Sequence, residues 1–67
     1  MKVREVIRRI EAEGWYLAST RGDHRKYKHP MKRGIVIVSG QLGLDMPIGT
    51  LRSVFRQAQL EWEDRNG

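Results

Sequence analysis

The sequence predicts one α+β domain in which a helix, three strands and a second helix follow one another along the chain. Three observations lead to this class: an amphipathic helical pattern near each end, strand-forming residues between them, and short connections rich in turn residues. Short connections favour a three-stranded antiparallel sheet with both helices on one face, where each can bury its apolar stripe. All 67 residues, 1–67, are expected to form a single domain without repeats or linkers.

The first helix is predicted over residues 2–13. Val3, Val6, Ile7 and Ile10 recur at helical spacing, and charged residues occupy the other positions of this segment. Gly14 stands where a helix C-terminal glycine is expected. The chain then changes to residues that suit a strand, so the helix should end at this point.

Three strands are predicted in the middle of the chain. Residues 15–20 are mostly aromatic, aliphatic or hydroxyl-bearing, and the Arg-Gly-Asp turn at 21–23 leads into a second, alternating strand at 24–29 that Pro30 ends. After a basic turn, the four β-branched residues 35–38 form the third strand. The third strand is apolar at both parities, and two short helices can cover only one sheet face, so a partner protein or a second copy should cover the other face.

The second helix follows an irregular segment at residues 41–48. Pro47, with Asp45 nearby, suits the opening of a helix. One apolar stripe then continues at helical spacing through Leu51, Val54, Phe55, Ala58 and Trp62. We expect Trp15, Tyr27, Phe55 and Trp62 to serve the core or an interface rather than to stack on bases.

Composition narrows the range of functions. The chain is too short for a deep substrate cavity, because a domain of this size buries only roughly 60% of its unfolded surface. It has no cysteine, which excludes disulfides and thiolate zinc sites and fits a cytoplasmic protein, and its charged N-terminus does not resemble a signal peptide or a membrane span. The net charge of +5 favours a polyanionic partner. The basic residues of the middle segment are the candidate phosphate or RNA-binding residues: Arg21, Arg25, Lys26, Lys28, Lys32 and Arg33.

His24 is the candidate catalytic residue, directly after the turn and inside this basic stretch. Side chains alternate along a strand, so His24, Lys26 and Lys28 share one face, which points outward if Tyr27 packs under the helices. An imidazole beside two ammonium groups suits chemistry on a phosphodiester, with a general base next to charges that hold the phosphate. Gly22 permits a positive φ in the turn, and together with Asp23 it should support the site.

Several segments together resemble the HicA toxins of bacterial and archaeal toxin-antitoxin systems. They are Gly14-Trp15, Gly22-Asp23-His24, Tyr27-Lys28-His29-Pro30, a valine-rich strand, Gly49-Thr50-Leu51-Arg52-Ser53-Val54 and Gln57-Ala58. The resemblance implies a fold like the double-stranded RNA-binding domain and a ribosome-independent endoribonuclease that cleaves messenger RNA. It implies His24 as the single catalytic histidine and a HicB-type antitoxin as partner. We expect no cofactor, and the geometry of the site is plausible without a metal. We also consider a homo-oligomer, and we expect no association with a membrane.

The chain departs from the usual family pattern at three places. Asp23 replaces a common serine, and its carboxylate can orient the His24 ring but also places negative charge near RNA. The histidine that many members carry after the third strand is absent, since the chain reads Val38-Ser39-Gly40-Gln41 here. Gln59 stands where the family commonly has glycine, so the last helix is expected to continue through Trp62 into Glu63.

Two other functions remain open from the residues themselves. A non-catalytic RNA-binding module of the same fold would use the lysines to grip the backbone, with His24 incidental. A small regulatory protein could bind DNA or another protein through the same basic face. The basic cluster could also serve only to discourage strand-to-strand aggregation. The simplest interpretation of His29, which precedes Pro30, is that it ends a strand.

Overall fold

The computed structural model describes residues 1–61. The elements follow the predicted order and are α1 (Val3–Ala12), β1 (Tyr16–Arg21), β2 (His24–Lys28), β3 (Val36–Ser39) and α2 (Ile48–Gln57). The predicted α+β class with α-β-β-β-α order is confirmed, and it agrees with a fold like the double-stranded RNA-binding domain. The expected continuation of the last helix through Trp62 into Glu63 lies outside the described residues.

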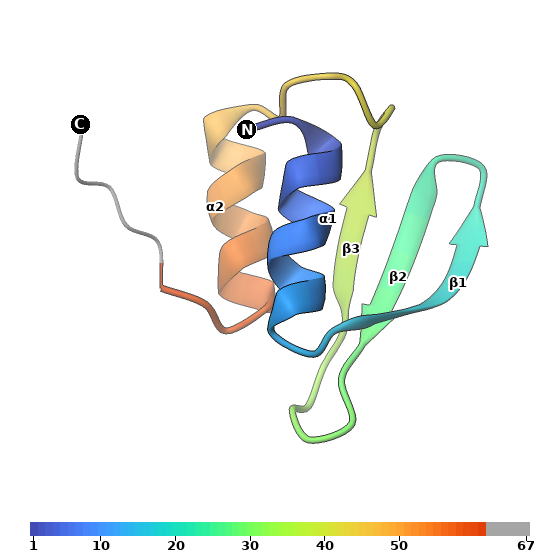
Figure 1. The fold of residues 1–67 in the computed structure, drawn as a ribbon, viewed down its shortest axis with the longest axis vertical. Coiled ribbons are helices and arrows are strands. Elements are labelled where there is room, and N and C mark those ends of the chain that lie inside the picture. Colours follow the sequence, from blue (N-terminus) through green and yellow to red (C-terminus); the bar gives the residue numbers. More distant parts are fainter. Residues whose placement is uncertain (62–67) are drawn as a thin grey trace.

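The three strands form one antiparallel sheet in the order β1-β2-β3. Both helices lie side by side over the β3 half of the sheet, while the β1–β2 hairpin extends beyond them (Figure 1). The register shifts between Leu17 and Ser19, so Ala18 forms an irregularity in β1. Every residue of β1 is exposed, because no helix covers this strand.

The core lies between the helices and the inner face of β2 and β3. Tyr27, Val36 and Val38 are buried there, which matches the alternation predicted for the second and third strands. Burial raises the pKa of Tyr27 above its usual value of 10.0; Glu11 adds to the rise and Arg25 opposes it. The other buried apolar residues are Val3, Val6, Ile10, Trp15, Met46, Leu51, Val54, Phe55 and Ala58.

Each helix ends in the same hydrogen-bonded turn. At the end of α1, Gly14 has a φ of +100°, its N–H donates to Glu11 O, and the N–H of Trp15 donates to Ile10 O. A similar turn ends α2 at Gln57, although the residue with positive φ is Gln59 (φ +60°). The expectation that α2 continues through residue 59 is therefore wrong.

The end of α2 is stabilised by tertiary contacts that offset the cost of a left-handed glutamine. The N–H of Gln59 donates to Arg56 O (3.0 Å) and the N–H of Leu60 donates to Phe55 O (2.9 Å). The partly buried Leu60 packs against the core, and the amide Nε2 of Gln59 donates to Arg33 O at 3.1 Å. These contacts require the chain to turn back, and a continuing helix would lose them.

The segment between β3 and α2 is fastened to the N-terminus. The N–H of Val3 donates to Leu44 O at 2.9 Å, the N–H of Met46 donates to Met1 O at 2.8 Å, and Lys2 pairs with Asp45 in an isolated antiparallel bridge. An irregular segment of this kind needs such partners for its backbone polar groups. The N-terminus thus sets the shape of the surface next to the end of β3.

The N–H of Lys2 donates to Glu5 Oε1 at 2.7 Å, and this hydrogen bond holds the pKa of Glu5 below its usual 4.5.

No helix among residues 1–61 combines the length and apolar composition needed to span a membrane.

Candidate functional site

The hairpin between β1 and β2 positions His24. Arg21 and His24 are the last paired residues of the hairpin, and Gly22 and Asp23 form its two-residue turn. Gly22 has a φ of +62°, while a Cβ at this position would meet no atom within 4 Å, so the backbone conformation alone favours glycine. The sharp turn places the His24 ring at the tip of the hairpin.

Backbone and side-chain hydrogen bonds tie this turn to the end of β3. The N–H of Gly40 donates to Asp23 O at 3.2 Å. Nη1 of Arg25 donates to Asp23 O at 3.2 Å and to Gly40 O at 2.9 Å. Arg25 points to the face opposite His24, where it is half-buried, and it serves as a brace. Its contact with RNA stays a prediction.

His24 faces outward and is accessible. The side chain is 68% exposed, and its Nε2 lies 3.7 Å from Oδ1 of Asp23, which is 56% exposed. This separation is too long for a hydrogen bond, and water screens the pair, so the interaction is weak. His24 is free to contact a ligand at the protein surface.

Two hollows meet at His24. The first, which we name the sheet groove, has a volume of about 390 Å³ on the outer face of the sheet and is lined by Ser19, Thr20, Arg21, His24, Lys26 and Ile37. The second, the loop pocket, has a volume of about 340 Å³ beside the N-terminal end of α2. It is lined by Val3, Asp23, His24, Ser39, Gly40, Leu44, Asp45, Met46, Pro47 and Thr50. His24 is therefore reachable from both sides.

The sheet groove combines His24 with two of the predicted cations. Arg21 is the cross-strand partner of His24, and Lys26 follows His24 two positions later on the same face. Lys28 continues this row about 7 Å further along the strand. These cations bring positive charge to the surface where the histidine is exposed.

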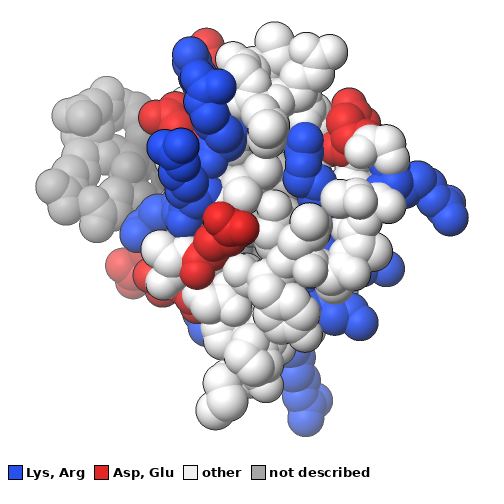
Figure 2. Space-filling view, turned by 45° about the vertical axis from the view of Figure 1, so that its right-hand side comes forward, with Lys and Arg blue, Asp and Glu red and all other residues white. Residues whose placement is uncertain are grey.

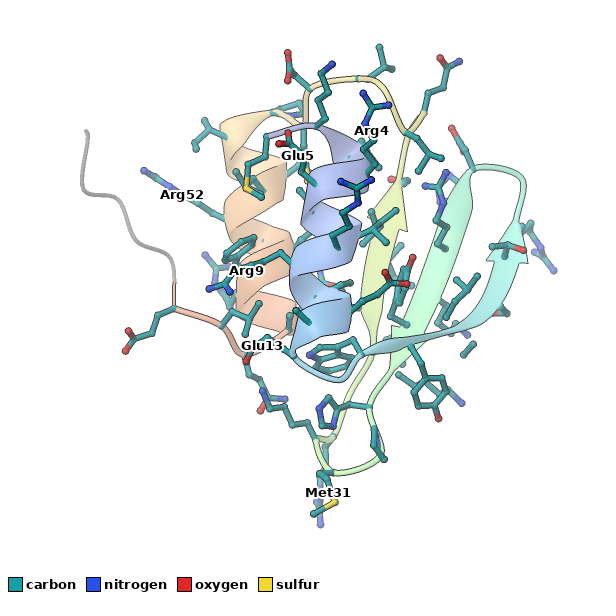
Figure 3. All side chains as sticks on the ribbon, viewed as in Figure 1. Arg4, Glu5, Arg9, Glu13, Met31 and Arg52 are labelled. Atoms are coloured by element: carbon teal, nitrogen blue, oxygen red, sulfur yellow. The ribbon has the colours of Figure 1, made fainter. Side chains whose placement is uncertain are left out.

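Lys32 and Arg33 lie in the loop after β2, beyond the opposite end of the strand from His24. Figure 3 shows Met31 at the tip of this loop, far from the hairpin turn. The five residues of β2 span about 16 Å, so these two cations cannot contact the same phosphate as His24. Their contact with a longer RNA stays a prediction.

Basic side chains also occur away from the groove. Figure 2 shows lysines and arginines on several parts of the surface, with uncharged residues between them, rather than in one continuous block. Arg4 and Arg9 of α1 and Arg52 of α2 project from the helices in Figure 3. Positive charge is therefore widespread on the surface, and the sheet groove differs from other basic parts because it combines Arg21 and Lys26 with His24.

His29 has a structural role that sequence reasoning missed. Its Nε2–H donates to Glu13 O at 2.9 Å, and its Nδ1 accepts from the backbone N–H groups of Met31 and Lys32 at 3.0 and 3.1 Å. Its ring also meets Trp15 edge-on, with centroids 5.2 Å apart. His29 thereby joins the end of α1 to the loop between β2 and β3. Only the adjacent proline marked this position in the sequence, and a proline does not predict these partners.

Residues 1–61 contain no group of three histidine, cysteine, aspartate or glutamate side chains placed to hold a metal ion together. The titratable groups at the hairpin tip are the His24 imidazole and the Asp23 carboxylate, and Asp45 is a further acidic residue that lines the loop pocket. The site therefore offers proton transfer and charge stabilisation as its chemistry.

A comparison with protein families identifies one match over most of the chain. The family model described as the HicA toxin of bacterial toxin-antitoxin systems matches residues 3–60. This range includes both helices, the whole sheet, His24 and both hollows. No curated protein matches the sequence.

Proposed function

The chain belongs to the HicA toxin family, whose members act as toxins with a cognate antitoxin, and on this premise we propose that it cleaves messenger RNA. In this proposal the protein is a ribosome-independent endoribonuclease, His24 is its catalytic residue, and a HicB-type antitoxin neutralises it. The proposed place of action is the cytoplasm, where messenger RNA is available.

One observation supports this proposal above the others: the exposed His24 lies in a groove with Arg21 and Lys26. A general base must reach the proton that it removes, and a phosphodiester needs positive charge around it as negative charge grows in the transition state. The groove offers both on one face of the sheet. Lys28 extends the row of positive charge along the backbone of a bound strand.

The proposed reaction begins with the neutral imidazole of His24, which removes the proton from a ribose 2′-hydroxyl. The 2′-oxygen attacks the adjacent phosphorus, and the bond between phosphorus and the 5′-oxygen of the next nucleotide breaks. The leaving oxygen takes a proton from the imidazolium or from water, so the products are a 2′,3′-cyclic phosphate and a free 5′-hydroxyl. Arg21 and Lys26 stabilise the charge that develops on the non-bridging oxygens.

The first test separates cleavage from binding. Wild type and His24→Ala are expected to bind RNA with similar affinity, because the cations of the groove remain, but only wild type should cut RNA and arrest growth. Met31→Ala, an exposed change at the far loop, is the matched control and should behave as wild type. Equal toxicity of wild type and His24→Ala would defeat the catalytic assignment and favour a non-catalytic RNA-binding module.

The second test concerns the nucleophile. An RNA oligonucleotide with a single 2′-deoxy substitution at the mapped cleavage position should resist cleavage there, since the attacking oxygen is missing. Mass spectrometry of the natural products should find the cyclic phosphate. A 3′-hydroxyl product, or cleavage that depends on added divalent metal, would contradict the proposed route.

The antitoxin is proposed to cover the outer face of β3. Ile37 is 36% exposed there and lines the sheet groove, and the neighbouring Ile35 is 42% exposed on the same parity. A partner seated on these side chains would bury apolar surface and block His24 together. Ile37→Lys should weaken the toxin-antitoxin complex in a titration by size-exclusion chromatography. Unchanged binding would refute this surface, and self-association of wild type that Ile37→Lys abolishes would assign it to a second copy instead.

A further inference from the structure

The loop pocket gives the site a second half that differs from the sheet groove in chemistry. Its apolar lining residues are Val3, Leu44, Met46 and Pro47, and its polar lining residues include Asp45 and Thr50. The hydrogen bonds between the N-terminus and residues 44 and 46 hold this lining in place. The pocket is thus formed by the fold before a ligand arrives.

Charge divides the two hollows around His24. The sheet groove holds Arg21 and Lys26, whereas the loop pocket holds Asp23 and Asp45 and no lysine or arginine among its lining residues. A phosphate is attracted to the first and repelled by the second. A bound RNA strand should therefore place its phosphate in the groove and an uncharged group in the pocket.

The size and lining of the loop pocket suit a nucleobase. Its volume of about 340 Å³ lies at the low end of the range for sites that hold small organic ligands. A base has two flat apolar faces and a polar edge, and the pocket offers an apolar wall together with hydrogen-bonding groups. Bases of single-stranded RNA are commonly read in this way, by packing on their faces and by hydrogen bonds to their edges.

An ionised carboxylate distinguishes between the four bases by the hydrogen-bond donors that they present, and Asp45 brings one to the lining of the loop pocket. Within residues 1–61 the Asp45 side chain has no hydrogen bond or ion pair, and an ionised carboxylate can only accept. Guanine presents two neighbouring N–H donors, at N1 and N2, which one carboxylate can accept together. Adenine and cytosine present one amino group beside a ring acceptor, and uracil presents one N–H between two carbonyls that a carboxylate repels.

We propose that the loop pocket binds the guanine base of a nucleotide next to the scissile phosphate, with Asp45 accepting from its N1–H and N2–H groups. This inference rests on the proposed cleavage of RNA and adds a base preference to it. Asp45 acts as a specificity residue on the side of His24 opposite the cations. Thr50, in the first turn of α2, also lines the pocket and is the proposed source of a further hydrogen bond to the same nucleotide.

A binding experiment tests the pocket without any cleavage. Guanosine, adenosine, cytidine and uridine carry no phosphodiester, and each is titrated to its solubility limit against ¹⁵N-labelled wild type. Guanosine should shift the backbone amide resonances of Leu44 and Asp45 more than the other three nucleosides, and Asp45→Asn should remove this difference. Equal shifts with all four nucleosides, or no shift at these residues, would overturn the inference.

A cleavage experiment tests the preference in the reaction. Wild type should cut RNA oligonucleotides that carry guanine at one position flanking the scissile bond on the order of tenfold faster than those with uracil there, as expected for one bidentate base contact. Asp45→Asn should reduce that ratio to near one, while Glu11→Gln, which removes the same charge at an exposed position of α1, should keep it.

The two hypotheses fail in different ways. If no RNA is cut, the proposed function fails, and the nucleoside titration still decides whether the pocket binds guanine. If RNA is cut but Asp45→Asn and wild type share the same base preference, the endoribonuclease assignment stands and the guanine site is refuted.

Discussion

Gly14→Ala should destabilise the protein through two separable effects at the junction of α1 and β1. Gly14 has a φ of +100°, which an alanine adopts only with strain. In addition, a Cβ at this position would lie 2.6 Å from Nε2 of His29, so the imidazole must move. Moving the ring breaks its hydrogen bond to Glu13 O and disturbs the two hydrogen bonds that Nδ1 accepts from the backbone N–H groups of Met31 and Lys32.

The expected magnitude follows from these contacts. The backbone strain costs about 1–3 kcal/mol, and each lost hydrogen bond adds about 1 kcal/mol. A loss of at least one bond gives a total of about 2–4 kcal/mol in the free energy of unfolding. A chain of this length has a total stability of about 3–10 kcal/mol, so the expected loss is a large fraction of the total and should be readily measured.

Urea denaturation followed by tryptophan fluorescence measures this change, because Trp15 lies against His29. Gly34→Ala is the matched control: its φ is +88°, but a Cβ there meets no atom within 4 Å, so only the backbone strain applies. A double-mutant cycle with His29→Ala isolates the contact. In the His29→Ala background, Gly14→Ala should cost about 1 kcal/mol less than in wild type, because there is no ring to displace.

Two results would refute this reasoning. If Gly14→Ala and Gly34→Ala have the same effect, the close approach to His29 carries no cost. If the cycle shows no coupling, His29 does not connect α1 to the loop after β2 as its hydrogen bonds indicate. Figure 3 shows the end of α1 at Glu13 directly above this loop, where the coupling is expected.

Three further predictions follow from the fold and the groove. The raised pKa of Tyr27 means that the folded state keeps the phenolic proton at pH values at which the unfolded state has lost it. The free energy of unfolding should therefore fall as the pH rises from 10 through the folded pKa, and denaturation curves of Tyr27→Phe should lack this pH-dependent loss. Gln59→Gly should be more stable than Gln59→Ala by about 1 kcal/mol in thermal unfolding, since both lose the amide contact but only glycine adopts a positive φ without strain; equal stability would contradict the observed helix end. Arg21→Gln and Lys26→Gln should each reduce the salt dependence of binding to a short RNA by about one phosphate contact. Arg9→Gln, which removes the same charge at an exposed position of α1, is the control that should leave the slope unchanged.

The architecture could be predicted from local patterns. The helical spacing of Val3, Val6 and Ile10 in α1 and the alternation through β2 each repeat within a few residues, so they do not depend on distant parts of the chain. The outward direction of His24 also follows from alternation once Tyr27 is buried. These predictions succeed because backbone geometry sets the period of each pattern.

The end of α2 and the role of Arg25 could not be predicted in this way. Intrinsic propensity favours continuing the helix through Gln59. When the chain turns back instead, Leu60 packs against the core and its N–H donates a hydrogen bond to Phe55 O. Arg25 belongs to a basic stretch, yet its strand position sends it toward the carbonyl groups of Asp23 and Gly40. In both cases the deciding partner is outside the pattern from which the prediction was made.

The sequence by itself determined the order of the elements, the position of the hairpin turn and the face that His24 shares with Lys26. Only the tertiary structure decided that His29 joins α1 to a loop and that Asp23 and Asp45 line one pocket beside His24. The physical reason is that periodicity and turn chemistry act between near neighbours in the chain. A pocket instead depends on how the N-terminus, the end of β3 and the start of α2 pack together.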